Sequence, residues 1–188
     1  MYMKNQYQKS KRLKKGSRTP KKLPKYLTES EISVILTNAK NSKMRDYIIL
    51  LTLWRTGLRV SELVKLTKND VRDNILVRLG KGHKDRIVPL ETELGTILKL
   101  YTDTLQPKDR LFNMTSRTIR NIINRYTPEG VHAYPHIFRH SFAVHCLKNG
   151  MNLRNLQLIL GHENLETTAI YLQLTQQDII DDFNKIKW

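Results

Sequence analysis

Cysteine is almost absent from the sequence. Cys146 is the only one among 188 residues, which excludes a disulfide within the chain and a zinc site built from paired thiolates. A chain without disulfides is typical of a reducing compartment, so we expect a cytoplasmic protein. Long apolar runs are missing as well: none reaches the roughly 20 residues of a transmembrane helix, and none follows the N-terminal charges as in a secretory signal. We therefore expect no membrane partner.

Acidic side chains are absent from the first 26 residues, which contain ten Lys and Arg. The whole chain has 33 basic and 17 acidic side chains, a formal net charge of +16. This excess favours a polyanionic partner, either nucleic acid or an anionic membrane surface. The membrane is the weaker alternative, because Leu13 and Leu23 are too sparse to form an apolar helix face. It also stays open that residues 1–26 are a flexible arm that only improves solubility.

After this arm the pattern becomes mostly helical. Thr28 followed by Glu31 predicts a capping box that begins a helix. The segment 44–57 is apolar on nearly all sides and stops at a glycine, as a buried helix does. Two short β-prone runs around a glycine-rich tip predict a hairpin over 74–90. Further helices are predicted over 58–66, 90–105, 115–126, 136–148, 152–160 and 165–173. The fold class is therefore mainly α with a small antiparallel β-hairpin (α+β).

Several cationic side chains stand out in this pattern, and each also has a plain explanation. Arg59 precedes Glu62 by three residues, a spacing that is equally typical of an ordinary surface ion pair. Lys81 and Lys84 lie at the tip of the predicted hairpin, where solvated lysines are common. Taken singly, these residues indicate no function.

A second group of polar residues lies in the C-terminal third of the chain. His136 and Arg139 share one side of a helix whose other side is apolar, which suits either solubility or the binding of an anion. Tyr171 comes nine residues after His162, half a turn out of phase on one continuous helix. The two side chains face one site only if the Gly-His-Glu-Asn segment interrupts the helix. Otherwise Tyr171 is a half-buried aromatic residue.

The segments around these residues form an ordered set. TGLRVSEL, GKGHKDRIVPL, HIFRHSFA and LGHENLETTAIYL follow one another along the chain. Together they closely resemble the catalytic domain of the tyrosine recombinases, the family of the phage integrases and Xer-type resolvases. The resemblance implies the fold of that domain and the activity of a site-specific DNA recombinase that cleaves and rejoins strands through a 3′-phosphotyrosine. The catalytic residues that it implies are Arg59, Lys81, His136, Arg139, His162 and Tyr171.

The resemblance also implies roles that these side chains can support. Tyr171 is the nucleophile that attacks a DNA phosphodiester. Arg59 and Arg139 offer forked donors to the non-bridging phosphate oxygens, which a point-like ammonium does less well. Lys81 protonates the departing 5′-oxygen. It is assigned because it matches the GKG segment, and Lys84 stays as the alternative.

The two histidines complete the implied site. His136 aids proton transfer at the tyrosine, His162 donates to a non-bridging oxygen, and Glu62 is structural, steadying Arg59. No cofactor and no metal are implied, because the phosphotyrosine bond conserves the energy of the broken phosphodiester. A zinc site at His136 and His140 would want a glutamate directly after the first histidine, where this sequence has an isoleucine.

Two other functions stay open beside the recombinase. A type IB topoisomerase resembles the recombinases in its catalytic residues, but the segments quoted above are nearer the recombinases. A non-catalytic DNA-binding module would share the helices and the charge, yet it has no use for an exposed Tyr171 aligned with two arginines. Double-stranded DNA is the expected partner in all three cases.

The domain organisation follows from the same comparison. We expect a basic arm over 1–26, a recombinase catalytic domain over 27–178 and a tail helix over 179–188. Most family members carry a separate helical domain before the catalytic one. The basic arm is expected to replace part of the DNA binding of that domain through electrostatic attraction. The apolar stripe of the tail is expected to contact a neighbouring protomer in a tetramer on paired DNA sites, with packing on its own core as the alternative.

Overall fold

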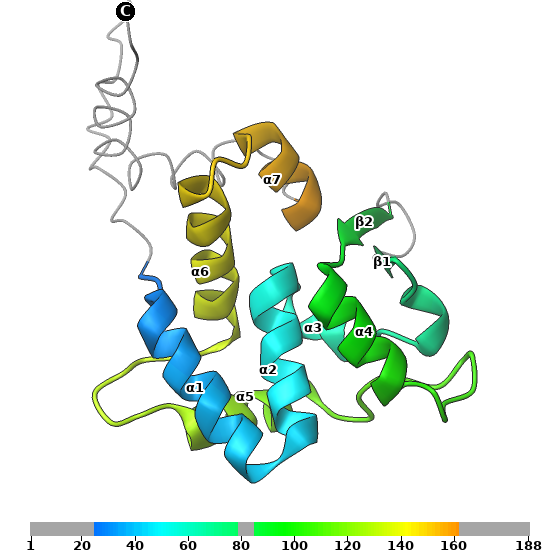
Figure 1. The fold of residues 1–188 in the computed structure, drawn as a ribbon, viewed down its shortest axis with the longest axis horizontal. Helices are drawn as coiled ribbons and strands as arrows, with labels where there is room; N and C mark the ends of the chain where they lie inside the picture. Colours follow the sequence, from blue (N-terminus) through cyan, green and yellow to red (C-terminus); the bar gives the residue numbers. More distant parts are fainter. Residues whose placement is uncertain (1–24, 79–84, 162–188) are drawn as a thin grey trace, which may run out of the picture.

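The structure, a computed structural model, describes residues 25–78 and 85–161. Within these residues it is mainly helical with one two-stranded antiparallel sheet, as predicted (Figure 1). The elements are α1 (Glu29–Ser42), α2 (Met44–Thr56), α3 (Val60–Leu63), the 3₁₀ helix η1 (Lys68–Asp70), β1 (Asn74–Val77), β2 (Arg86–Pro89), α4 (Thr92–Tyr101), α5 (Ser116–Tyr126), α6 (Pro135–Lys148) and α7 (Leu153–Leu160).

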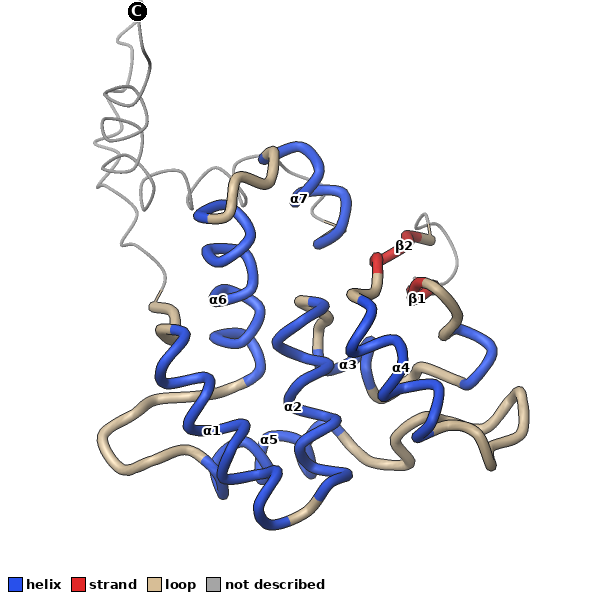
Figure 2. The backbone as a smooth tube through the Cα atoms, viewed as in Figure 1, coloured by secondary structure: helices blue, strands red, loops and turns tan. Residues whose placement is uncertain are grey.

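Helix α2 lies at the centre of the described region. It packs against α1 and α6 on one side and against α4 on the other, and it also touches α5 (Figure 2). Most of its residues are buried, which confirms the interpretation of its apolar sequence as a core helix. It ends at Gly57, which adopts the left-handed conformation with φ +61° and donates its N–H to the carbonyl of Leu53.

The beginning of α1 confirms the predicted capping box. The hydroxyl of Thr28 accepts a hydrogen bond from the N–H of Glu31 at 3.2 Å, and Glu31 Oε2 accepts from the N–H of Thr28 at 2.7 Å. Two backbone donors that no helical carbonyl could satisfy are thereby paired. The buried face of α1, formed by Ile32, Ile35 and Ala39, then packs on α2 and α5.

The predicted hairpin is confirmed by the pairing of β1 with β2. Ile75 lies opposite Val88, and Val77 lies opposite Arg86. Successive residues of a strand point to opposite faces, and on β2 the buried positions are Arg86 and Val88. Helix α7 packs against β2, so the arginine of this strand points into an interface between elements far apart in sequence.

Two helices are shorter than predicted. The helix expected over 58–66 is only α3, and the one expected over 90–105 ends with Tyr101. The segments that follow these two helices bond to each other: the N–H of Lys68 donates to the carbonyl of Asp109, and the ammonium of Lys68 donates to the carbonyls of Asp103 and Leu105. Bonds between segments this far apart in the sequence cannot be read from local periodicity.

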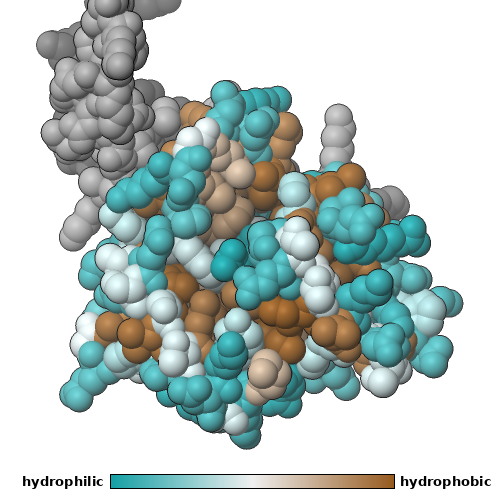
Figure 3. Space-filling model, viewed as in Figure 1, coloured by the Kyte–Doolittle hydropathy of each residue, from teal (hydrophilic) through white to brown (hydrophobic). Residues whose placement is uncertain are grey.

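The visible surface agrees with this packing. Hydrophilic residues cover the outer sides of the helices, and hydrophobic atoms show mainly between them (Figure 3). Across residues 25–78 and 85–161, no helix is long and apolar enough to cross a membrane.

Candidate active site

Arg59 occupies the N-cap position of α3, directly after the turn at Gly57 and Leu58. Its backbone N–H donates to Glu62 Oε2 at 2.7 Å, and its Nη1 donates to Glu62 Oε1 at 3.0 Å. The side chain of Arg59 keeps about a third of its surface exposed, 36%, against 7% for Glu62. The interpretation of Glu62 as a residue that steadies Arg59 is confirmed.

Glu62 has a second cationic partner that the sequence analysis missed. Arg86 on β2 donates from Nη1 to Oε1 at 2.9 Å and from Nη2 to Oε2 at 2.8 Å, a bidentate pair between two buried side chains. Burial acts to raise the pKa of Glu62, but the hydrogen bonds and charge of Arg86, with the Arg59 N–H and the charge of Arg139, outweigh it and lower that pKa. Glu62 is therefore ionised at neutral pH.

Arg139 on α6 lies in the same neighbourhood but is almost completely buried, 3% exposed. Its Nη1 donates to the carbonyl of Gly57 at 2.7 Å, and its Nη2 donates to the carbonyl of Leu160 at 2.6 Å. Both carbonyls belong to helix ends that lack an intrahelical donor, so the cation stabilises the C-terminal ends of α2 and α7. Arg139 therefore lies close to the turn that precedes Arg59. His136 and Arg139 were expected on one side of the helix, but only His136 is exposed, and Arg139 is buried.

The C-terminal end of α7 is held by two arginines. Arg86 Nε donates to the carbonyl of Ile159 at 2.7 Å, next to the carbonyl of Leu160 that Arg139 binds. Gly161 then ends the helix in the left-handed conformation with φ +63°, and a Cβ there would lie 2.9 Å from Cδ of Arg86. The predicted interruption of the helix before His162 is thus present at Gly161.

His136 lies in the first turn of α6 and is exposed, unlike Arg139 one turn further on. Its ring centroid is 6.3 Å from that of His140. Burial, followed by the charges of His136 and Arg139, lowers the pKa of His140, which favours its neutral form. Within residues 25–78 and 85–161, no three His, Cys, Asp or Glu side chains are grouped so that they could hold a metal ion.

Three of the six predicted catalytic residues, Lys81, His162 and Tyr171, lie outside the described residues, as does Lys84. The same is true of the predicted helix over 165–173, the tail over 179–188 and the basic arm up to residue 24. Two of these predicted residues can still be located in the sequence relative to the described elements. Lys81 lies between β1 and β2, and His162 directly follows the end of α7.

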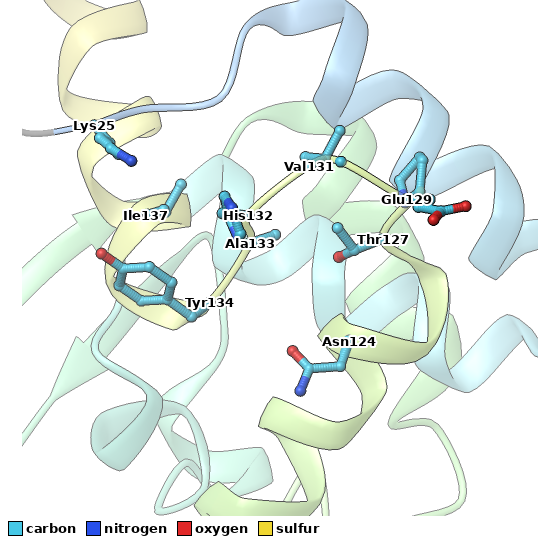
Figure 4. Close-up of a pocket in the computed structure, with 11 residues that line it drawn as sticks. Lys25, Asn124, Thr127, Glu129, Val131, His132, Ala133, Tyr134 and Ile137 are labelled. Atoms are coloured by element: carbon cyan, nitrogen blue, oxygen red, sulfur yellow. The ribbon is translucent and has the colours of Figure 1, made fainter.

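A pocket of about 640 Å³ lies elsewhere, beside the connection between α5 and α6 (Figure 4). Its walls are Lys25 and residues between 124 and 137, among them His132 and Tyr134. It is lined by none of the three predicted catalytic residues that the structure describes. The candidate active site is the surface beside Arg59 and His136.

Comparison with known proteins is in keeping with this geometry. Residues 25–178 match the phage integrase family. The chain belongs to that family. A phage integrase family relative, "Tyrosine recombinase XerA" of Thermococcus onnurineus, is 40% identical over 176 residues, which cover 86% of this chain and 62% of the relative. The chain thus spans somewhat under two thirds of the length of that curated relative.

Solved structures in the family share the fold. A XerA recombinase matches with a TM-score of 0.73 and 33% identity, over 88% of this chain and 67% of the other. The catalytic domain of bacteriophage HP1 integrase matches with a TM-score of 0.65 and 31% identity, over 86% of this chain and 95% of that domain. The predicted fold, that of a tyrosine recombinase catalytic domain, is confirmed.

No role of Arg86 was predicted from the sequence, although this residue lies in a segment quoted for the resemblance. A signal was present: Arg86 and Val88 are two residues apart on a predicted strand, so they share a face, and Val88 is the kind of residue that packs inward. An arginine on an inward face needs buried hydrogen-bond acceptors, and a carboxylate is the acceptor that also balances its charge. Glu62, in the preceding quoted segment, was the available partner.

Proposed function

We propose that this chain is the catalytic part of a site-specific DNA recombinase that cleaves and rejoins strands through a 3′-phosphotyrosine intermediate. The observation that carries the proposal is the convergence of Arg59 and Arg139 on one short turn. Arg139 binds the carbonyl of Gly57, and Arg59 begins α3 two residues later. Two guanidinium groups fixed by separate elements around one turn suit the recognition of a phosphate.

The reaction consists of two transesterifications. The Tyr171 oxygen forms a bond to phosphorus as the bond to the 5′-oxygen breaks, with Lys81 giving that oxygen a proton and His136 helping to remove the tyrosine proton. A 5′-hydroxyl then attacks the phosphotyrosine, and the same groups act in reverse. No bond energy is lost to hydrolysis, so no nucleotide or metal is required for the balance.

The arginines contribute positioning and charge. Phosphoryl transfer spreads negative charge over the equatorial oxygens, and its catalysis is chiefly the stabilisation of that charge by fixed donors. Arg59 is held at two points by Glu62, and Arg139 is held by two carbonyls at 2.7 and 2.6 Å. Donors fixed before the substrate binds need little reorganisation during the reaction. His162, from its place after α7, supplies a further donor to a non-bridging oxygen.

The partner we propose is double-stranded DNA, with four protomers acting on two paired sites. The excess of basic side chains supports DNA, and the family's recombinases supply the analogy for assembly. Residues 179–188 would then contact a neighbouring protomer. The location we propose is the cytoplasm, in association with DNA, and the single cysteine of the sequence is in keeping with a reducing compartment.

The test is the trapping of the covalent intermediate. The protein is incubated with nicked duplexes whose sequences cover the DNA that flanks its gene. Cleavage close to the nick releases a short fragment that carries the 5′-hydroxyl, and the loss of this fragment prevents religation. We expect a denaturation-resistant protein–DNA adduct with the wild type and none with Tyr171→Phe. DNA binding without an adduct in either protein would favour the non-catalytic module. Relaxation of supercoiled DNA without exchange of partners would favour the topoisomerase.

A further inference from the structure

All three guanidinium nitrogens of Arg86 donate hydrogen bonds, and they reach two partners. Nη1 and Nη2 donate to both carboxylate oxygens of Glu62, and Nε donates to the carbonyl of Ile159. The arginine is 9% exposed and Glu62 is 8% exposed. Desolvating a pair of this kind costs about as much as its attraction returns, so stability alone is a weak reason for its presence.

The carboxylate of Glu62 is the link between Arg86 and the proposed phosphate-binding Arg59. Oε1 accepts from Nη1 of both arginines, at 2.9 Å from Arg86 and 3.0 Å from Arg59. One negative charge is thus shared by two cations, and the three side chains together carry a net charge of +1. If Arg86 were neutral, Glu62 and Arg59 would form a neutral pair, and the field that Arg59 offers to an anion would weaken.

The same arginine reaches the other side of the site. Ile159 is the penultimate residue of α7, three positions before His162. Arg86 belongs to β2, the strand that follows Lys81 in the sequence. Gly161 lies so close to the Arg86 side chain that a Cβ at position 161 would be within 3.1 Å of Cδ, Nε and Nη1 of Arg86. Arg86 therefore bonds both to the carboxylate that holds Arg59 and to the end of α7.

We infer that Arg86 is a positioning residue for the recombination reaction: it balances the charge of Glu62 so that Arg59 stays electropositive toward the phosphate, and it anchors the end of α7 beside Arg59. This rests on the proposed function, because it assigns Arg59 to the scissile phosphate. Arg86 acts through Glu62 and does not touch the DNA phosphate itself.

The test compares two substrates that differ in charge at the scissile phosphate. One is an ordinary nicked duplex, and in the other a methyl group replaces one non-bridging oxygen, which makes the phosphonate neutral. Single-turnover rates of adduct formation are measured at saturating DNA for wild type and Arg86→Gln. On the ordinary duplex we expect Arg86→Gln to be about 10- to 100-fold slower. On the neutral duplex we expect the loss to shrink to about threefold or less, because the charge that Arg59 must stabilise is gone.

Arg78→Gln is the matched control. Arg78 follows β1, pairs with Asp70 at 2.8 Å and is 62% exposed, so the variant removes the same charge from the same hairpin without touching Glu62. We expect it to cleave both duplexes at wild-type rates once DNA is saturating. A loss in Arg86→Gln no greater than in Arg78→Gln would overturn the inference, as would equal losses of Arg86→Gln on the two duplexes, which indicate a structural role only.

Folding and the proposed function are tested separately. Circular dichroism and thermal unfolding are recorded for each variant, and if Arg86→Gln does not fold, Arg86→Met is used, whose unbranched apolar side chain suits the buried position and likewise lacks the charge. The same substrate-dependent loss is expected for it, and equal losses on both duplexes again contradict the inference. If the wild type forms no adduct on the ordinary duplex, the proposed function itself fails before any variant is compared.

Discussion

Arg139 donates from Nη1 to the carbonyl oxygen of Gly57 at 2.7 Å, although the two residues are 82 positions apart in the sequence. The bond joins α6, which carries His136, to the turn that precedes Arg59. Because α2 ends at Gly57 with an unpaired carbonyl, the arginine satisfies a helix end while it fixes the relative position of two segments. Architecture and proposed catalysis therefore depend on the same side chain.

Replacing either proposed phosphate-binding arginine should slow cleavage but affect stability differently. Arg59→Ala and Arg139→Ala are each expected to lower the rate of adduct formation by on the order of 10²–10³. Arg139→Ala should also reduce the free energy of unfolding by about 2–4 kcal/mol, because two buried helix-end carbonyls lose a charged donor. Arg59→Ala, from a partly exposed position, should cost less than about 1 kcal/mol. Single-turnover cleavage and urea unfolding measure the two effects.

The comparison of the two variants separates chemistry from folding. Full cleavage by folded Arg139→Ala would limit Arg139 to a structural role and remove one of the two proposed phosphate donors. A large loss of stability in Arg59→Ala would instead show that Glu62 depends on Arg59 and not chiefly on Arg86.

The pH dependence of stability should contain a contribution from Glu62. Burial acts to raise its pKa in the folded protein, but the hydrogen bonds and charge of Arg86, with the Arg59 N–H and the charge of Arg139, outweigh that effect and lower the pKa. A carboxyl with a lowered folded-state pKa contributes stability that is complete above its unfolded-state pKa, near 4.5, and that is lost as the pH falls toward the folded-state pKa. We expect urea unfolding between pH 7 and pH 3 to show this loss in the wild type. In Glu62→Gln the profile should be flatter below pH 4.5, and an unchanged profile would contradict the assignment.

The turn at Gly57 should tolerate no side chain. Its φ is +61°, and a Cβ there would overlap the ring of Phe142. Gly57→Ala therefore combines a left-handed backbone, which costs about 1–2 kcal/mol, with overpacking of the core, which costs about 1–3 kcal/mol. Gly150→Ala is the matched control, because Gly150 has φ +81° but no atom within 4 Å of its Cβ position. Thermal unfolding should show the larger loss for Gly57→Ala, and equal losses would mean that the Phe142 ring moves away at little cost.

Much of the fold could be predicted from local sequence. The capping box at Thr28, the buried helix that ends at Gly57 and the hairpin between β1 and β2 each rest on a few neighbouring residues, and all three are confirmed. The end of α4 at Tyr101 could not be predicted in this way. The segment that follows α4 is bonded to a distant part of the chain, since the ammonium of Lys68 donates to the carbonyls of Asp103 and Leu105.

In the candidate site, too, some contacts could be predicted from local sequence and others depend on residues far apart in the chain. Arg59 and Glu62 are three residues apart, and their contact followed from spacing alone. Arg86 and Glu62 are 24 positions apart in the sequence. Their contact could be inferred only by combining two arguments: the alternation of side chains along a strand, and the need of a buried charge for a partner. The burial of Arg139 could not be read from α6 by itself, because its partners are the ends of two other helices.

The basic arm should determine how DNA binding responds to salt. With about six phosphate contacts, the affinity of the full chain is expected to fall about 10³-fold between 50 and 200 mM salt. Deleting residues 1–25 removes ten cations and no acidic side chain, so the slope of log affinity against log salt should become less steep. A chain with the same arm in scrambled order is the control: because counterion release depends on charge and not on sequence, it should keep the original slope. If the deletion leaves the slope unchanged while the cleavage rate at saturating DNA is also unchanged, the arm makes no phosphate contacts, and the cations of residues 26–188 account for binding by themselves.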